Sequence, residues 1–63
     1  MTYNIKALRS NRNMTQQDLA DMLGVSKVTI SNYEKGAVPS NSAKMLKYSL
    51  AYIFQVDIDD IRL

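Results

Sequence analysis

The chain has 63 residues, among them no cysteine and no histidine. A disulfide, a thiolate nucleophile and a histidine base are therefore excluded, and a zinc site, which draws its ligands mostly from these residues, is not expected. Apolar residues make up 46% and charged residues 22%, which is typical of a folded globular chain and not of a disordered one. We expect one domain over residues 1–63, with no cofactor, no metal and no small-molecule substrate.

The net charge of +2 is unevenly distributed along the sequence. Residues 1–56 carry seven basic and three acidic side chains (+4), whereas residues 57–63 carry one basic and three acidic ones (−2). A basic body suits a polyanion such as nucleic acid, although many solvated surfaces carry similar charges. No apolar run approaches the roughly 18 residues of a membrane span, and the N-terminus lacks the apolar segment of a signal peptide. We therefore expect a cytoplasmic protein without membrane contact.

Helix signals recur along the chain, while no stretch alternates apolar and polar residues for long enough to predict a strand. Ile5 and Leu8 predict a first helix, which ends where neighbouring Asn residues favour a turn. Thr15 predicts the N-cap of a second helix, with Asp18 as its reciprocal partner in a capping box. Gly24 stands where a left-handed residue would end that helix.

The next segment predicts a third helix directly after the second. Ser26 can cap this helix, Ile30 and Tyr33 form its buried pair, and Gly36 ends it. The second and third helices are therefore joined by a very tight turn over residues 24–26.

The C-terminal third of the chain predicts two more helices. One of residues 40–42 caps a fourth helix that runs to about Phe54. Asp57 caps a short last helical turn through Ile61, with Asp60 in the capping-box position. The fold class that we predict is all-α, a compact bundle of five short helices.

The second and third predicted helices carry five residues with a meaningful spacing. Gln16 is followed by Ala20, Gly24, Ile30 and Glu34 at +4, +8, +14 and +18. Ala20 is small because the next helix crosses directly over it, and Gly24 permits the positive φ of a tight turn. Ile30 helps to clamp the two helices at a steep angle. This is the helix-turn-helix pattern, whose second helix can enter a DNA major groove.

The stretch TQQDLADMLGVSKVTISNYEKG resembles the helix-turn-helix of phage repressors and Cro proteins, the XRE family. LRSNR before it, and the Pro-Ser and YIFQVDIDDI after it, are similar to that family's flanks, so the resemblance covers nearly the whole chain. It implies a five-helix fold, usually dimeric, that regulates transcription. The chain departs from the family between Gly36 and Val56, which lie about two residues further apart than usual, and at Gln55, where the family often has Gly.

The resemblance places three side chains at positions that touch base edges. Lys27 can donate to guanine, Asn32 can pair with adenine, and Val28 can pack either on a thymine methyl or inside the protein. Thr29 and Ser31 could reach bases or phosphates. The alternative is that these are ordinary exposed residues of a capped helix.

The resemblance also implies phosphate contacts on both sides of that helix. Gln16 matches the family residue at the N-terminus of the second helix, where a backbone N–H and the side chain can both meet a phosphate. Lys35 matches the loop that grips the DNA backbone on the other side. Gln17, Ser26 and Ser31 are further candidates for phosphate contact, although the glutamines could simply be solvated.

Arg9 and Glu34 match a family pair that forms a partly buried salt bridge between the first and third helices. The planar fork of an arginine suits a two-handed bridge to a carboxylate. We interpret this pair as structural. The alternative is an Arg9 that binds phosphate while Glu34 stays free.

The fourth predicted helix has a second apolar stripe beside the one that faces the core. Met45, Tyr48 and Tyr52 form this stripe. Tyrosine rings that lie over the core would explain it in the ordinary way. The family usually dimerises through this end of the chain, so we favour a dimer surface that this stripe, Tyr52 above all, shares with Val56 and Ile58.

We therefore predict a sequence-specific transcriptional regulator, a Cro-like repressor that binds a palindromic operator in double-stranded DNA as a homodimer. Helix 26–35 is expected to lie in the major groove. The alternative is an antitoxin-type interaction module that also binds DNA. An enzyme is not expected, because the one carboxylate cluster, Asp57, Asp59 and Asp60, is explained by capping and lacks the Gly and the trailing Glu of a calcium loop.

Overall fold

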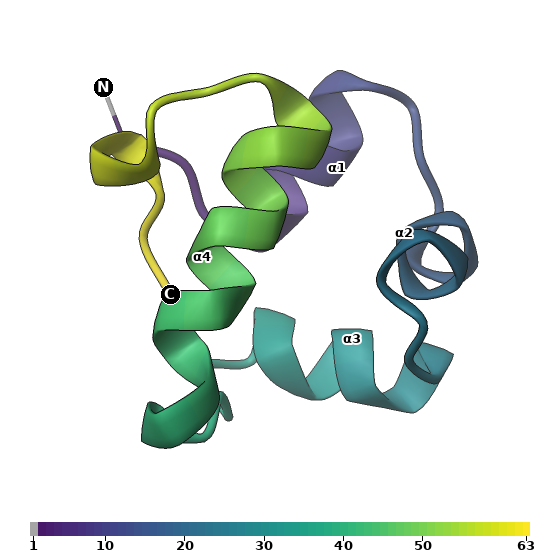
Figure 1. The fold of residues 1–63 in the computed structure, drawn as a ribbon. Helices are drawn as coiled ribbons and strands as arrows, with labels where there is room; N and C mark the ends of the chain where they lie inside the picture. Colours follow the sequence, from purple (N-terminus) through teal and green to yellow (C-terminus); the bar gives the residue numbers. More distant parts are fainter. Residues whose placement is uncertain (1) are drawn as a thin grey trace.

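The structure is a computed structural model that describes residues 2–63 (Figure 1). These residues form four α-helices followed by one short 3₁₀ turn. The all-α class is therefore confirmed, but the prediction of five helices is wrong. In chain order the elements are α1 (Ile5–Asn11), α2 (Gln16–Leu23), α3 (Lys27–Glu34), α4 (Ser40–Phe54) and the 3₁₀ turn η1 (Ile58–Asp60).

The predicted fifth helix is only the three-residue turn η1. The Asp57 carboxylate accepts a hydrogen bond from the N–H of Asp59 at 2.9 Å. The predicted partner, Asp60, instead donates its N–H to the Asp57 carbonyl at 2.9 Å. The turn cannot lengthen into an α-helix because the next residue, Ile61, is extended and pairs with Tyr3.

The two ends of the described chain lie side by side and run parallel. The Tyr3 N–H donates to the Asp60 carbonyl at 2.6 Å, and the Arg62 N–H donates to the Tyr3 carbonyl at 2.8 Å. Ile61 is buried between these two bonds. Backbone pairing between distant segments thus closes the fold where sequence patterns predicted more helix.

Local capping explains where α2 and α3 begin, and here the sequence predictions are confirmed. The Thr15 hydroxyl accepts the Asp18 N–H at 3.0 Å, and the Asp18 carboxylate accepts the Thr15 N–H at 2.9 Å. Gly24 ends α2 in the left-handed conformation, with φ 72°. The Ser26 hydroxyl then caps α3 by accepting the Thr29 N–H at 3.1 Å.

The start of α4 differs from its prediction. Pro39 occupies the N-cap position, and no side chain caps the helix, so the expected capping by one of residues 40–42 is wrong. Proline sets its own φ near −58°, close to the helical value, and thereby orients the chain into the helix without a hydrogen bond.

The core lies where the four helices and the last residues meet. Leu19, Ile30 and Leu50 are completely buried and contribute one residue each from α2, α3 and α4. Ala20 is also completely buried, which agrees with the requirement that α3 cross closely over it. The remaining buried apolar residues are Ile5, Leu8, Leu46, Phe54 and Ile61.

The end of α4 is fixed by two polar side chains. Gln55 is left-handed, with φ 55°, and its side-chain amide donates to the Tyr52 carbonyl at 2.6 Å. Arg12 donates to the Phe54 carbonyl at 2.7 Å, and its guanidinium carbon lies 5.8 Å from the centre of the Phe54 ring. Gln55 therefore takes a left-handed conformation that glycine adopts more readily. The bond from Arg12 ties the end of α4 to the end of α1.

Replacing Gly24 by alanine should lower the free energy of unfolding by about 1 kcal/mol, because a left-handed L-residue is strained. An added Cβ would meet no other atom within 4 Å, so no steric clash adds to this cost. Gly24→Asn is the matched control and should cost less, since asparagine tolerates this conformation. Urea unfolding measures both variants, and equal losses for Ala and Asn would contradict the explanation.

Candidate nucleic-acid interface

One edge of α3 faces solvent along its whole length. Lys27, Val28, Asn32 and the residue after the helix, Lys35, are exposed, whereas Ile30 on the opposite side is completely buried. The exposed side chains are basic, amide or small and apolar. These groups can donate to guanine, pair with adenine and contact a thymine methyl.

Val28 is 68% exposed. The sequence left open whether it packs inside the protein, and the structure places it on the outer edge of α3. An exposed branched apolar side chain between two polar neighbours is costly in water and suits contact with a thymine methyl.

The small hydroxyl side chains at the start of α3 and within it are partly engaged inside the protein, which limits their contacts with DNA. The Ser26 hydroxyl caps the helix and also lies 2.9 Å from the Thr29 hydroxyl, so each satisfies the other. Ser31 is half-buried. A contact of Ser26 or Thr29 with DNA would have to share or replace these bonds.

The two glutamines at the start of α2 point in different directions. The Gln16 amide donates to the Glu34 carboxylate at 3.1 Å, so its NH₂ group is directed inward. The Gln17 amide donates to Asp21 at 2.9 Å on the exposed side of the helix. A phosphate at this helix terminus would meet backbone N–H groups and the positive end of the helix.

Arg9 and Glu34 form a two-handed ion pair between α1 and α3. Arg9 Nε donates to one carboxylate oxygen at 2.7 Å, and Nη2 donates to the other at 3.1 Å. The remaining Nη1 donates to the Met14 carbonyl at 3.0 Å. Both side chains are largely buried, with 14% and 8% exposed, so the guanidinium is engaged inside the protein and is not presented to a phosphate.

This network shifts the protonation of both partners. The hydrogen bonds from Arg9 lower the pKa of the Glu34 carboxyl below its ordinary value; burial opposes this shift and the bond from Gln16 adds to it. The bond to Glu34 likewise raises the pKa of Arg9. The network joins α1, the start of α2 and the end of α3, and so fixes the angle at which α3 presents its exposed edge.

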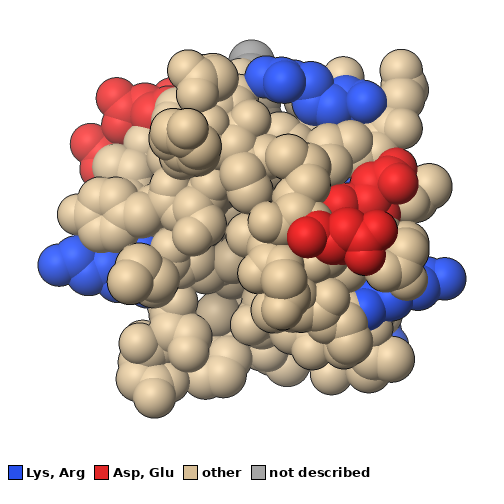
Figure 2. Space-filling model, turned by 45° about the vertical axis from the view of Figure 1, so that its right-hand side comes forward, with Lys and Arg blue, Asp and Glu red and all other residues tan. Residues whose placement is uncertain are grey.

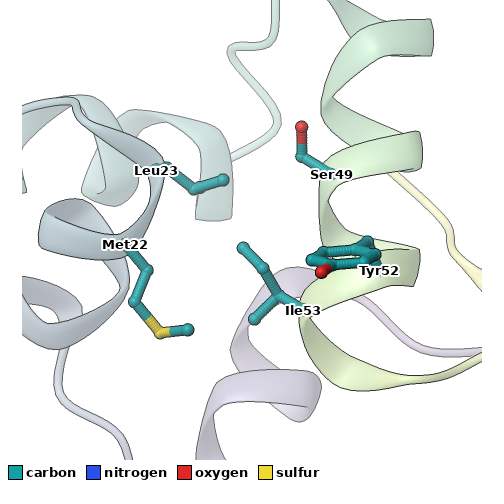
Figure 3. A pocket seen from close by; sticks show the side chains of 5 residues that line it. All are labelled: Met22, Leu23, Ser49, Tyr52 and Ile53. Atoms are coloured by element: carbon teal, nitrogen blue, oxygen red, sulfur yellow. The ribbon is translucent and has the colours of Figure 1, made fainter.

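The three residues predicted for a dimer surface do not share a face. Tyr52 is 80% exposed and lines a hollow between α2 and α4 together with Met22 (Figure 3). Val56 lines a different hollow, beside α1 and Tyr3. Ile58 belongs to η1, on the side of α4 away from α2 (Figure 1).

The part of the chain that the structure describes gathers no three acidic, histidine or cysteine side chains that could hold a metal ion. Within residues 2–63, no helix combines the length and the apolar character needed to cross a bilayer.

Comparison with known proteins gives a consistent result. A helix-turn-helix family model matches residues 5–59. The chain is 41% identical over 61 residues to an uncharacterized HTH-type transcriptional regulator of Archaeoglobus fulgidus, covering 97% of this chain and 83% of that protein. It is also 41% identical to one of Methanocaldococcus jannaschii, covering 97% and 89%, and 36% identical to a second protein of A. fulgidus, covering 97% and 84%. No solved structure matches.

Glu34→Gln should lower the free energy of unfolding at neutral pH by about 1–3 kcal/mol, because a largely buried Arg9 loses its charged partner. The folded-state pKa of Glu34 is lowered. Its contribution is therefore complete above the ordinary glutamate pKa of about 4.3 and is lost as the pH falls through the lowered value. Urea unfolding at a series of pH values should show the gap between wild type and variant closing in acid. A gap that persists at the most acidic pH would contradict a role for the charge.

Proposed function

Because the chain belongs to the helix-turn-helix family of transcriptional regulators, we propose that it binds a specific operator in double-stranded DNA and represses transcription there, in the manner of Cro. Members of this family are generally not enzymes. The DNA-binding function rests on the family, the repressor role rests on the resemblance to Cro proteins, and the roles of single residues rest on the geometry of α3.

The exposed edge of α3 is the observation that carries the proposal. Lys27, Val28 and Asn32 lie on it as exposed side chains, and the one acidic residue of α3, Glu34, is turned inward and paired. An ordinary solvated helix face would carry acidic as well as basic side chains. We assign base readout to these three residues, with Thr29 in a lesser role.

Phosphate contacts on either side would set the register of α3 in the major groove. Lys35 lies at the end of α3 as an exposed cation. On the other side, Gln16 and Gln17 form the first turn of α2, where backbone N–H groups favour an anion. Ser26 and Ser31 contribute to the extent that their other contacts allow.

A single α3 reads only a few base pairs, which is too little to select one site among the 10⁶ or more that a genome offers. We therefore propose a homodimer on a palindromic operator, with half-sites about 34 Å apart. The contact lies in the C-terminal third, through Tyr52 on one side of α4 or through Val56 and Ile58 on the other. The relatives' names do not favour an antitoxin role.

Asn32→Ala and Lys27→Ala should each weaken operator binding by about 1–3 kcal/mol, because each removes a contact to a base edge. The operator is first defined by selecting bound duplexes from a random pool, which should return an inverted repeat. Fluorescence anisotropy then compares operator with unrelated DNA, and only the operator should lose affinity on Asn32→Ala. Ser10→Ala, an exposed change on α1, is the control. Unchanged operator affinity in both readout variants would show that α3 is misassigned.

Operator affinity should fall steeply as salt rises, since phosphate contacts release condensed counterions. The slope of log K against log salt should be about −0.9 for each phosphate neutralised, for several phosphates. Lys35→Ala should reduce the magnitude of this slope by about one, and Asn32→Ala should leave it unchanged. Titrations at a series of salt concentrations measure the slopes, and a flat response would argue against DNA as the partner.

A further inference from the structure

A continuous groove runs between α4 on one side and α2 and α3 on the other. Its upper part has a volume of about 430 Å³ and is lined by Met22, Leu23, Ser49, Tyr52 and Ile53 (Figure 3). Its lower part, of about 250 Å³, shares Leu23 and Ser49 with the upper part and ends at Tyr33 of α3. We call this feature the α2–α4 groove.

The borders of the α2–α4 groove hold most of the large apolar side chains that this chain leaves in solvent. Met22 is 57% exposed on the α2 side, and Met45, Tyr48 and Tyr52 are 72%, 53% and 80% exposed on the α4 side. The three residues of α4 are spaced three and four apart, so they form one ridge. In residues 2–63 the one other exposed large apolar side chain is Val28, on the DNA-facing edge of α3.

Such a concentration of large, exposed apolar side chains is unusual for a surface that stays in water. Contiguous exposed apolar patches mark interaction sites, and methionine and tyrosine are enriched at the centres of protein interfaces. Figure 2 shows a broad uncharged area with acidic and basic groups around it. Each tyrosine keeps a polar hydroxyl that water can solvate. This face is therefore suited to a partner that binds reversibly.

We propose that the α2–α4 groove is the contact of the homodimer, and that its occupant is the same groove of a second copy of this chain. This inference rests on the proposed operator-binding dimer and decides which side of α4 forms it. Tyr52 and Met45, both on the apolar stripe that the sequence indicated, belong to the contact together with Met22 of α2, which the sequence did not single out. Val56 and Ile58 lie outside.

The charges at the two borders favour a second copy over an unrelated partner. Beyond Met22 the exposed surface of α2 carries Asp18 and Asp21, and beyond Tyr48 the surface of α4 carries Lys44, all of them exposed. A two-fold axis along the groove lays the α2 border of each copy against the α4 border of the other. The carboxylates of one copy then face the lysine of the other, twice.

The face that contains the α2–α4 groove is large enough for a stable dimer interface. A stable interface buries about 800 Å² on each partner, which is about a fifth of the 4252 Å² surface of this chain. The molecule measures 28 × 26 × 18 Å, so one broad face can supply that area. The tyrosine ridge of each copy would pack against the α2 border of the other.

This arrangement also places the DNA-reading helices correctly. The groove ends at Tyr33, and α3 crosses that end of the molecule (Figure 1). Rotation about an axis along the groove leaves each α3 at the same end of the dimer. Asn32 and Val28 are exposed and do not line the groove, so the exposed edge of each α3 stays uncovered in this dimer.

The experiment follows the methionine methyl groups of the wild-type chain by NMR during dilution, beside sedimentation at the same concentrations and without DNA. Met22 and Met45 should shift with the monomer–dimer equilibrium, and Met14, which packs against the core, should not. A dimer whose Met22 and Met45 signals stay fixed would overturn the proposal, since the contact would then lie elsewhere. A monomer at high micromolar concentration would also overturn it and leave the groove to another partner.

Variants test the apolar contact and the charge pairing of the proposed dimer separately. Tyr52→Glu should raise the dimer dissociation constant about tenfold or more, and Ser10→Glu on the exposed face of α1 should leave it unchanged. Lys44→Glu should weaken the dimer by repulsion, and adding Asp21→Lys should restore it; no restoration would contradict the proposed pairing. Circular dichroism checks that each variant is folded. Because dimerisation is measured without DNA, an intact dimer that fails to bind an operator would fault the proposed function and not this contact.

Discussion

The ion pair between Arg9 and Glu34 is the interaction on which the presentation of α3 depends. In a domain this small only a few residues are completely buried, so apolar packing alone leaves the angle between short helices loosely determined. The pair bonds α1 to the end of α3 through both carboxylate oxygens, and Gln16 adds the start of α2 to the same carboxylate. A two-handed bond fixes direction as well as distance. The orientation of the exposed edge of α3 is therefore determined from inside the protein.

The parts of the fold that could be predicted from the sequence are those that depend on neighbours within three or four residues. The capping box of Thr15 and Asp18 and the left-handed Gly24 are of this kind, because side chain and backbone meet whatever the rest of the chain does. The helix expected after Asp57 failed for the opposite reason. Ile61 pairs with Tyr3, at the other end of the chain, and no local pattern signals that pairing. The bond from Arg12 to the carbonyl of Phe54 is non-local in the same way, and no sequence pattern signals it.

The candidate site divides in a similar way. The family resemblance identified the positions of α3, and the structure separates side chains that are free from those already bonded. Lys27 and Asn32 are exposed, whereas Thr29 shares a hydrogen bond with the cap of its own helix. The dimer residues could not be separated from sequence, because the left-handed Gln55 turns the chain away from the direction of α4 and places Val56 on another side of the molecule than Tyr52.

The α2–α4 groove and the exposed edge of α3 meet in one short helix, and this links the two proposed activities. Tyr33 closes the lower end of the α2–α4 groove, and its neighbour in sequence, Asn32, faces outward. A helix held on one side by a second copy and on the other by the core has little freedom left to lose when it enters a major groove. Binding to two half-sites also favours the dimer over the monomer by mass action. Self-association and operator binding would thus strengthen each other, although no residue is required to take part in both.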